Sequence, residues 1–239
     1  AYAGLNALLL AQAGVTGAPA ETVEDEAVAA HWRDIGQRWE IDAQYFKPWP
    51  VCRWAQPALT AMTRLMAEYP QIRGENIERI QVQTFHESMR LQGHTPSNAD
   101  EAQYALAFPL AALVVRGQVG PLEVTGEAIH APDILAVSQR IDIVESEELS
   151  ERFPNEILSR VVVQLKDGQA LTSPITAAKG DPETAMTRAE FLAKFSLLAG
   201  ISLAPEQRLG IEQAIAALPG SASCETLFAL LFEQAGSPW

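Results

Sequence analysis

The segment from Ala105 to Val115 constrains the fold of this chain more than any other part of the sequence. All of its side chains are apolar, so a helix over this segment is apolar around most of its circumference and has to be buried at the centre of a domain. The helical pattern begins near Asp100 and ends at Gly117. Pro109 lies inside it and has no backbone N–H to donate, so we expect the helix to be kinked or divided in two.

Hydrophobic periodicity and turn residues predict the other elements of the chain. We expect helices over residues 1–13, 24–33, 56–68, 133–140, 187–198, 205–218 and 224–234, and strands over residues 39–45, 76–85, 141–145, 160–165 and 170–177. Asp167-Gly168 predicts a hairpin turn between the last two strands, and Pro174 restricts the last strand to a sheet edge. Thr187 and Glu190 have the spacing of a capping box at a helix start.

The order of these elements indicates an α+β fold. Helices at both ends flank a middle part in which strands and helices mix, as expected for an α/β domain inserted in a mostly helical domain. We therefore assign residues 1–45 to the helical domain, residues 46–200 to the α/β domain, and residues 201–239 to helices that return to the helical domain. The sequence starts as if in the middle of a helix, with no initiator Met. We expect only the C-terminal part of the helical domain to be present; the alternative is a first helix that frays after Met removal.

The charge balance excludes two classes of function. Asp and Glu total 30 and Lys and Arg total 17, which gives a formal net charge of -13. A nucleic-acid-binding protein carries a basic stripe, which this sequence lacks, and an anionic membrane surface would repel the chain. The longest apolar runs, 105–115 and 227–232, are far shorter than the ~20 residues that span a bilayer. We therefore expect neither nucleic acid nor a membrane as a partner.

The numbers and spacing of cysteines and histidines limit which cellular compartment and which cofactors we expect. Cys52 and Cys224 are the only cysteines, which is too few for a disulfide framework, so we expect reduced thiols. The sequence shows no export signal, and we expect a cytoplasmic location. Its four histidines never reach a metal-ligand spacing such as H-x-x-x-H, so we expect no metal. No Gly-rich phosphate loop is present, and a nucleotide cofactor is therefore not expected.

The segment Lys47-Pro-Trp-Pro-Val-Cys-Arg-Trp54 is the best candidate for chemistry. Its two prolines stiffen a loop that holds Lys47 and Arg53 near the start of the helix that follows Gln56. Free N–H groups at a helix start favour an anion, and two nearby cations favour it further, so the arrangement suits a carboxylate ligand. A lysine among tryptophans is also a candidate general base. The alternative is that Lys47 and Arg53 are solvated loop cations beside core tryptophans.

Four segments, in this order, resemble signatures of the MmgE/PrpD family, whose members include 2-methylcitrate dehydratase, cis-aconitate decarboxylase and iminodisuccinate epimerase. They are Gly14-Val-Thr-Gly17, Lys47–Trp54 with Gln56-Pro57-Ala58, Pro96–Gln103 with the apolar helix to Gly117, and Lys179-Gly-Asp-Pro182 with Lys194-Phe195. The ordered set is far more specific than any one segment, and it spans residues 4–200.

The resemblance implies a helical domain that carries a smaller α/β lid over residues 46–200, with the active site between them. It implies that this chain corresponds to the C-terminal half of the family fold, that the N-terminal half is missing, and that the protein is a homodimer. Lys47 matches the family's active-site lysine, which transfers a proton at a carbon next to a carboxylate or binds that carboxylate. Cys52 lies where some relatives have a histidine that lines the pocket. Where dehydratases and decarboxylases carry a serine and a tyrosine, this sequence has Ala105 and Phe108.

We therefore expect a cofactor-independent enzyme that removes and returns a proton next to a carboxylate of a small di- or tricarboxylate. Lys47 is the predicted catalytic residue, and Arg53, Cys52 and Phe108 are predicted to bind the substrate. The missing serine and tyrosine hydroxyls favour an epimerase, similar to iminodisuccinate epimerase, over a lyase similar to 2-methylcitrate dehydratase. A non-catalytic subunit that kept the fold is a further alternative, against which the presence of both cations argues.

Overall fold

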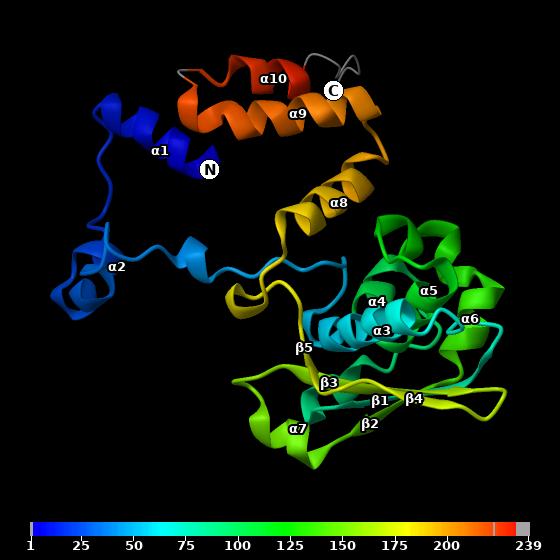
Figure 1. Ribbon diagram of the computed structural model, residues 1–239. Coiled ribbons are helices and arrows are strands. Elements are labelled where there is room, and N and C mark those ends of the chain that lie inside the picture. The colour runs from blue at the N-terminus through cyan, green and yellow to red at the C-terminus, as the bar shows by residue number, and fades with distance from the viewer. Residues whose placement is uncertain (1, 222, 233–239) are drawn as a thin grey trace. The chain divides into compact units, whose positions relative to one another are not determined.

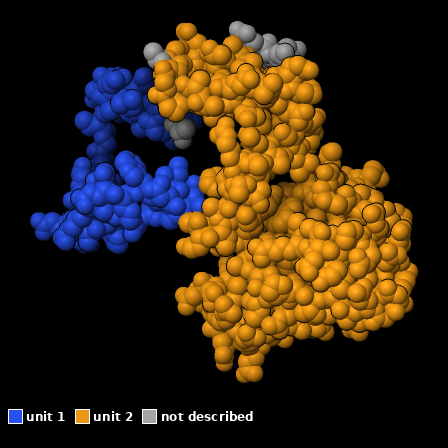
Figure 2. Space-filling model, viewed as in Figure 1, with its two compact units in different colours: residues 1–44 blue, residues 45–239 orange. Residues whose placement is uncertain are grey.

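The computed structural model describes residues 2–221 and 223–232 (Figure 1). The chain divides into two compact units, residues 1–44 and residues 45–239 (Figure 2), and each is described by itself. The division of the chain into three domains at residues 45 and 200 stays a prediction. No helix in the described ranges is long and apolar enough to cross a membrane.

The first unit consists of short helices that bury no side chain. They are α1 (Tyr2–Gln12), α2 (Glu21–Glu24) and the 3-10 helices Glu26–Trp32 and Glu40–Ala43. The continuous helix predicted over 24–33 is wrong because Asp25 accepts a hydrogen bond from the N–H of Ala27 and begins a separate 3-10 helix. The strand predicted over 39–45 is also wrong. Its alternating side chains Trp39 and Ile41 are 61% and 67% exposed, and alternation without a partner strand does not form a ladder.

The second unit is built on a mixed sheet with the strand order β2-β1-β3-β4. The strands are β1 (Ile77–Thr84), β2 (Ile141–Glu145), β3 (Leu158–Leu165), β4 (Ala170–Thr172) and β5 (Thr176–Ala177). β1 and β2 are parallel, whereas β1, β4 and β5 all pair antiparallel with β3. Ile80 and Val82 lie opposite Val163 and Val161, and all four are fully buried. This register turns one apolar face of the sheet toward the helices (Figure 1).

The central buried helix is α5 (Ala107–Arg116), in which residues 107–114 are all buried. The helix predicted over 100–115 is divided as expected, but at residues 104–106, ahead of Pro109. The proline therefore falls in the first turn of α5, where its missing N–H is not needed. The N–H groups of Leu106 and Phe108 donate instead to the carbonyls of Leu91 (2.7 Å) and Gly93 (3.2 Å).

Three further helices surround α5 on the same side of the sheet (Figure 1). They are α3 (Gln56–Glu68), α4 (Ala99–Gln103) and α6 (Pro132–Ser138). α3 contacts both α5 and β3, while α6 packs along α5. α7 (Glu147–Arg152) was not expected from the sequence, because Leu149 is its only buried residue and one apolar position gives no periodicity.

Turn and capping residues determine where the strands at the sheet edge and the first C-terminal helix begin and end. Gly168, with a φ of 91°, forms the predicted hairpin between β3 and β4, and Pro174 separates β4 from β5 because it cannot donate to the ladder. The predicted capping box forms: the N–H of Glu190 donates to Thr187 Oγ1 at 3.3 Å, and the N–H of Thr187 donates to Glu190 Oε2 at 2.6 Å. It opens α8 (Arg188–Ala199), which is followed by α9 (Pro205–Ala217) and α10 (Glu225–Phe232). The predicted end of the last helix at residue 234 lies outside the described residues.

Short 3-10 helices complete the second unit. They are Arg53–Ala55, His86–Leu91, Pro121–Glu123, Gly126–His130, Pro182–Thr184 and Leu218–Gly220. With its mixed sheet covered by helices, the chain has the predicted α+β fold.

Gly93 gives a test of how α5 is held. Its φ is 45°, and a Cβ there would lie 2.3 Å from the Cβ of Ala105. We expect Gly93→Ala to lower the free energy of unfolding by about 2–4 kcal/mol, because backbone strain and steric overlap add. Gly168→Ala is the matched control: its φ is 91° with nothing within 4 Å, so only strain of about 1–2 kcal/mol applies. Urea denaturation followed by circular dichroism compares the two, and equal losses would contradict this account.

Candidate functional site

The loop of residues 46–53 is held in place by backbone hydrogen bonds. Its two prolines fix two φ angles. The N–H of Val51 donates to the carbonyl of Trp49 at 2.9 Å, and the N–H of Cys52 donates to the carbonyl of Gln103 at 2.8 Å. The loop then runs directly into a 3-10 turn and α3. Its side chains are therefore positioned by the buried core.

A buried amide fastens this loop to the start of α3. Gln56 is 1% exposed, and its Nε2 donates to the carbonyls of Trp49 (3.1 Å) and Val51 (3.2 Å). Two loop carbonyls thus converge on one side chain, which fixes the path of the loop. The sequence pattern predicts Gln56 only as the start of a helix. A sequence signal for this role is present: Gln56 is a polar residue at the start of a helix whose first two turns are buried.

Lys47 folds back over its own loop. Its Nζ donates to the carbonyl of Val51 at 3.2 Å, and the side chain is half-buried. The carbonyl of Lys47 accepts a hydrogen bond from Lys194 Nζ at 2.5 Å. The pKa of Lys194 lies below its ordinary value, first because burial penalises the ammonium form and second because of the charge on Lys47. Two lysines therefore meet at this loop.

Arg53, the second predicted cation of the loop, is engaged on two sides. Its Nη1 lies 2.6 Å from Asp181 Oδ1, and its guanidinium carbon lies 3.9 Å from the centre of the Tyr45 ring. The side chains of Arg53 and Asp181 are only 26% and 20% exposed, so water screens this pair less than a surface ion pair. A substrate carboxylate would share Arg53 with Asp181, since a guanidinium carries five N–H donors.

Lys47, Cys52 and Arg53 line one pocket of 290 Å³. The other residues that line it are Tyr45, Pro50, Val51, Gln103 and Tyr104. The loop therefore brings together three of the four residues predicted to form the site. Cys52 carries a free, half-buried thiol. The volume is at the small end of ligand pockets, which suits a small di- or tricarboxylate.

Phe108, the fourth predicted residue, is 0% exposed within α5. The structure places it in the core and does not bring it to the loop, and its contact with substrate stays a prediction. Tyr104, by contrast, is 69% exposed and lines the pocket beside Lys47. The resemblance concerns hydroxyls only at positions 105 and 108. The hydroxyl of Tyr104 was not predicted, because the break before α5 is what turns Tyr104 outward.

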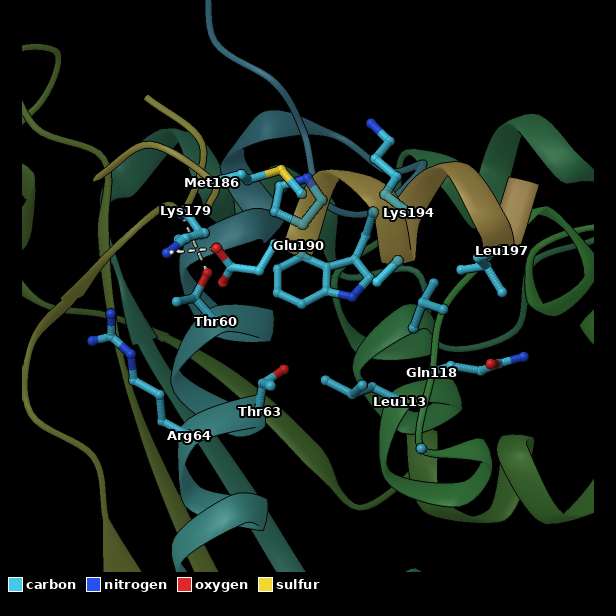
Figure 3. Close-up of a pocket in the computed structure, with 15 residues that line it drawn as sticks. Thr60, Thr63, Arg64, Leu113, Gln118, Lys179, Met186, Glu190, Lys194 and Leu197 are labelled. Carbon is cyan, nitrogen blue, oxygen red and sulfur yellow. Dashed lines mark hydrogen bonds and ion pairs between the residues drawn. The ribbon is translucent and has the colours of Figure 1, made fainter. Parts of the chain in front are cut away.

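A larger groove of 590 Å³ adjoins the loop at Trp49 (Figure 3). Its lining is mostly apolar, with polar side chains from α3, α8, the segment before α8 and the segment after α5: Thr60, Thr63, Arg64, Gln118, Lys179, Glu190 and Lys194. Glu190 and Lys179 form an ion pair there at 3.2 Å, so one of its cations is already neutralised. Arg53 in the smaller pocket is paired with Asp181 in the same way, so ion pairing alone does not separate the two cavities. The smaller pocket is taken as the candidate site because it brings together Lys47, Cys52 and Arg53.

The charged groups around the loop suit an anion rather than a metal ion. Ammonium and guanidinium groups form the strongest hydrogen bonds with carboxylates. Within the part of the chain that the structure describes, no three His, Cys, Asp or Glu side chains come together in a way that could hold a metal ion.

Comparison with known proteins places this loop, from residue 49 onward, inside a known domain. The family model described as MmgE/PrpD C-terminal domain matches residues 49–218, which is more than half of the chain. The match begins two residues after Lys47 and includes Cys52, Arg53 and Lys194. A search among curated proteins finds no match to this chain.

Adding a hydroxyl group at position 108 and removing one at position 104, in separate variants, tests the placement of Phe108 and Tyr104. Phe108→Tyr would bury a hydroxyl in an apolar core, so we expect it to lower the free energy of unfolding by about 1–3 kcal/mol. Tyr104→Phe is the matched control at an exposed position, where we expect a change below about 0.5 kcal/mol. Thermal and urea unfolding measure both. A Phe108→Tyr variant as stable as the parent protein would place that ring at a polar surface.

Proposed function

This chain belongs to the MmgE/PrpD family, and on that premise we propose that it moves a proton at the carbon next to a carboxylate of a small di- or tricarboxylate, without a cofactor. Members of the family are generally enzymes. We propose that the reaction is an epimerisation, similar to that of iminodisuccinate epimerase. Lys47 is the proposed catalytic residue, and Arg53 and Cys52 are the proposed substrate contacts.

The observation that supports this proposal is the presence of two cations in one pocket on a rigid loop. Removing a proton next to a carboxylate leaves an extra electron pair on that carboxylate, and nearby cations stabilise the added charge. Lys47 and Arg53 line the same 290 Å³ pocket. Because the loop is fixed by Gln56, these groups need little reorganisation when the charge develops.

In the proposed reaction, the Lys47 ammonium first releases a proton to water; its amine then takes the proton from the α-carbon and becomes an ammonium ion again. The electron pair of the broken C–H bond moves into the carboxylate that Arg53 holds. Return of a proton to the opposite face of the same carbon inverts the configuration, and no other bond breaks. That second step needs an acid on the opposite face, and we propose that a part of the family fold outside the matched C-terminal domain supplies it.

Tyr104 favours a second candidate function, a lyase similar to 2-methylcitrate dehydratase. Tyr104 lines the pocket that Lys47 also lines, and in this candidate function its phenol would donate a proton to a leaving hydroxyl group. The C–H and C–O bonds would then both break, giving an alkene and water. This observation weakens the sequence argument that the site lacks a hydroxyl acid.

The ion pair between Arg53 and Asp181 favours a third candidate, a subunit that binds polycarboxylates without turnover. A guanidinium that already pairs with a carboxylate at 2.6 Å contributes less to stabilising a new negative charge. Such a chain would bind the ligand and leave its protons in place.

Proton NMR in deuterium oxide, with a panel of small di- and tricarboxylates, distinguishes the three candidates. An epimerase washes out the α-proton signal without an alkene, a lyase produces alkene signals, and a binding subunit does neither. We expect wash-out without an alkene from the wild-type chain. A chain that binds carboxylates but exchanges no proton would contradict the catalytic proposal and favour the binding subunit.

Lys47→Ala tests the role of the lysine. We expect its wash-out rate to fall by at least about 100-fold, because the general base is lost, with an unchanged far-ultraviolet circular dichroism spectrum. Lys166→Ala, on the exposed hairpin between β3 and β4, is the matched control and should react at the wild-type rate. Unaltered turnover in Lys47→Ala would remove the lysine from the mechanism.

A further inference from the structure

One face of α8 carries the residues that hold the Lys47 loop. Lys194 follows Glu190 by four positions and Phe191 by three, so its side chain leaves the helix on the same side as each of theirs. Figure 3 shows Glu190 directed at Lys179, while Lys194 extends away from that pair. Lys194 reaches the carbonyl of Lys47 instead. The same helix face therefore contacts both the loop and the turn of residues 179–182.

The hydrogen bond from Lys194 to the loop is short, and it requires the Lys194 ammonium group to be partly removed from water. Its Nζ lies 2.5 Å from the carbonyl oxygen of Lys47, and the side chain is half-buried. Burial opposes the charged form of this lysine, as the direction of its pKa shift records. The half-buried ammonium is compensated by a charge-assisted bond to a backbone carbonyl, which is stronger than a neutral hydrogen bond. That carbonyl belongs to the proposed catalytic residue.

A glycine places the turn against the residue before Lys47. The N–H of Phe46 donates to the carbonyl of Gly180 at 2.9 Å. Gly180 has a φ of 103°, and a Cβ there would lie 1.9 Å from the carbonyl oxygen of Phe46. Only glycine permits this approach. On the other side, the ring of Phe46 meets the ring of Phe191 edge to face, with 5.0 Å between the centroids.

Two ion pairs connect the same turn to the helix and to the far end of the loop. Lys179 pairs with Glu190 at 3.2 Å, and Glu190 also caps the start of α8. Asp181 pairs with Arg53 at 2.6 Å. Both ends of the loop are thus tied to one turn, and that turn is tied to α8. We call Lys179, Gly180, Asp181, Glu190, Phe191 and Lys194 the loop clamp.

We propose that Lys194 is a positioning residue, which fixes the backbone of Lys47 through its carbonyl and so sets where the Lys47 amine stands in the pocket. This inference rests on the proposed function of Lys47. The segment from Lys179 to Lys194 would then contribute to the reaction by positioning Lys47, and Lys194 itself would not contact the substrate. Losing the bond would leave the substrate contacts in place but misplace the base, and small displacements of a reacting group reduce rates strongly.

The rate of hydrogen exchange at the Phe46 N–H, measured by NMR on assigned protein, tests the loop clamp without relying on enzymatic activity. Lys194→Met keeps the length of the side chain and removes the donor, and we expect exchange at Phe46 to rise about tenfold or more, as loss of a charge-assisted bond implies. Lys194→Arg keeps a charged donor and should restore exchange to within about threefold of wild type. Arg188→Met removes an exposed cation from the same helix and is the matched control, expected to leave exchange unchanged.

The deuterium wash-out rate of the same variants measures the catalytic consequence. We expect kcat to fall about tenfold or more in Lys194→Met with little change in KM, because a misplaced base weakens the transition state and not substrate binding. Unchanged exchange at Phe46 in Lys194→Met, or an equal rise in Arg188→Met, would overturn the proposal. If wild-type protein shows no wash-out, the function proposed for Lys47 fails, while the exchange data still decide whether Lys194 holds the loop.

Gly180→Ala tests the other part of the loop clamp, the close approach of the turn to Phe46. Its added methyl group displaces Phe46 while leaving Lys194 in place, so we expect faster exchange at Phe46 and a lower kcat. Gly168→Ala, with a similar φ and open space around it, is the control. Exchange at Phe46 that does not respond to Gly180→Ala would show that the turn does not hold the loop.

Discussion

The burial of α5 is the constraint on which the second unit depends. A helix whose residues 107–114 are all buried needs apolar cover on every side, and burying each large side chain contributes about 1.5–3 kcal/mol. The sheet covers one side, and α3 and α6 cover others. The position of α3 follows from this packing, because its own residues Leu59 and Met62 are 1% and 0% exposed.

The site is an extension of that packing. Gln56 stands at the head of α3, and its amide holds two carbonyls of the preceding loop, so the placement of the helix also places Lys47 and Arg53. The turn and α8 then hold the loop from the other side. This arrangement matters for a chain with a net charge of -13, whose overall field repels a polycarboxylate. Capture of such an anion depends on cations that are fixed close together.

The sequence predicted what depends on local pattern and missed what depends on contacts between distant residues. The buried helix, β2 and the capping box at Thr187 follow from residues that are near one another in the chain, and the structure contains all three. The strand expected over 39–45 failed because alternation says nothing about whether a partner strand is present. A segment can therefore have the alternating pattern of a strand and still not form one, because strand formation also requires a partner strand.

The same distinction applies within the site. The loop motif identified Lys47, Cys52 and Arg53, which are neighbours in sequence, and they line one pocket. Phe108 was predicted because the resemblance puts it where dehydratases and decarboxylases carry a tyrosine. The break in the helix at residues 104–106 leaves Phe108 in the core and Tyr104 at the pocket. The bond from Lys194 to Lys47 spans 147 positions of the chain, and no periodicity or spacing signals such a contact.

The central claim is that Lys47 and Arg53 form an anion site on a loop fixed by the core. NMR titration of isotope-labelled protein with tricarballylate, a tricarboxylate without a hydroxyl group to eliminate, measures this directly. The account predicts saturable shifts at the backbone amides of Cys52, Arg53 and Tyr104 and at the Nε–H of Arg53, with an affinity that falls as salt is raised. Saturable shifts confined to the groove beside Thr63 and Gln118, with none at the loop, would contradict it.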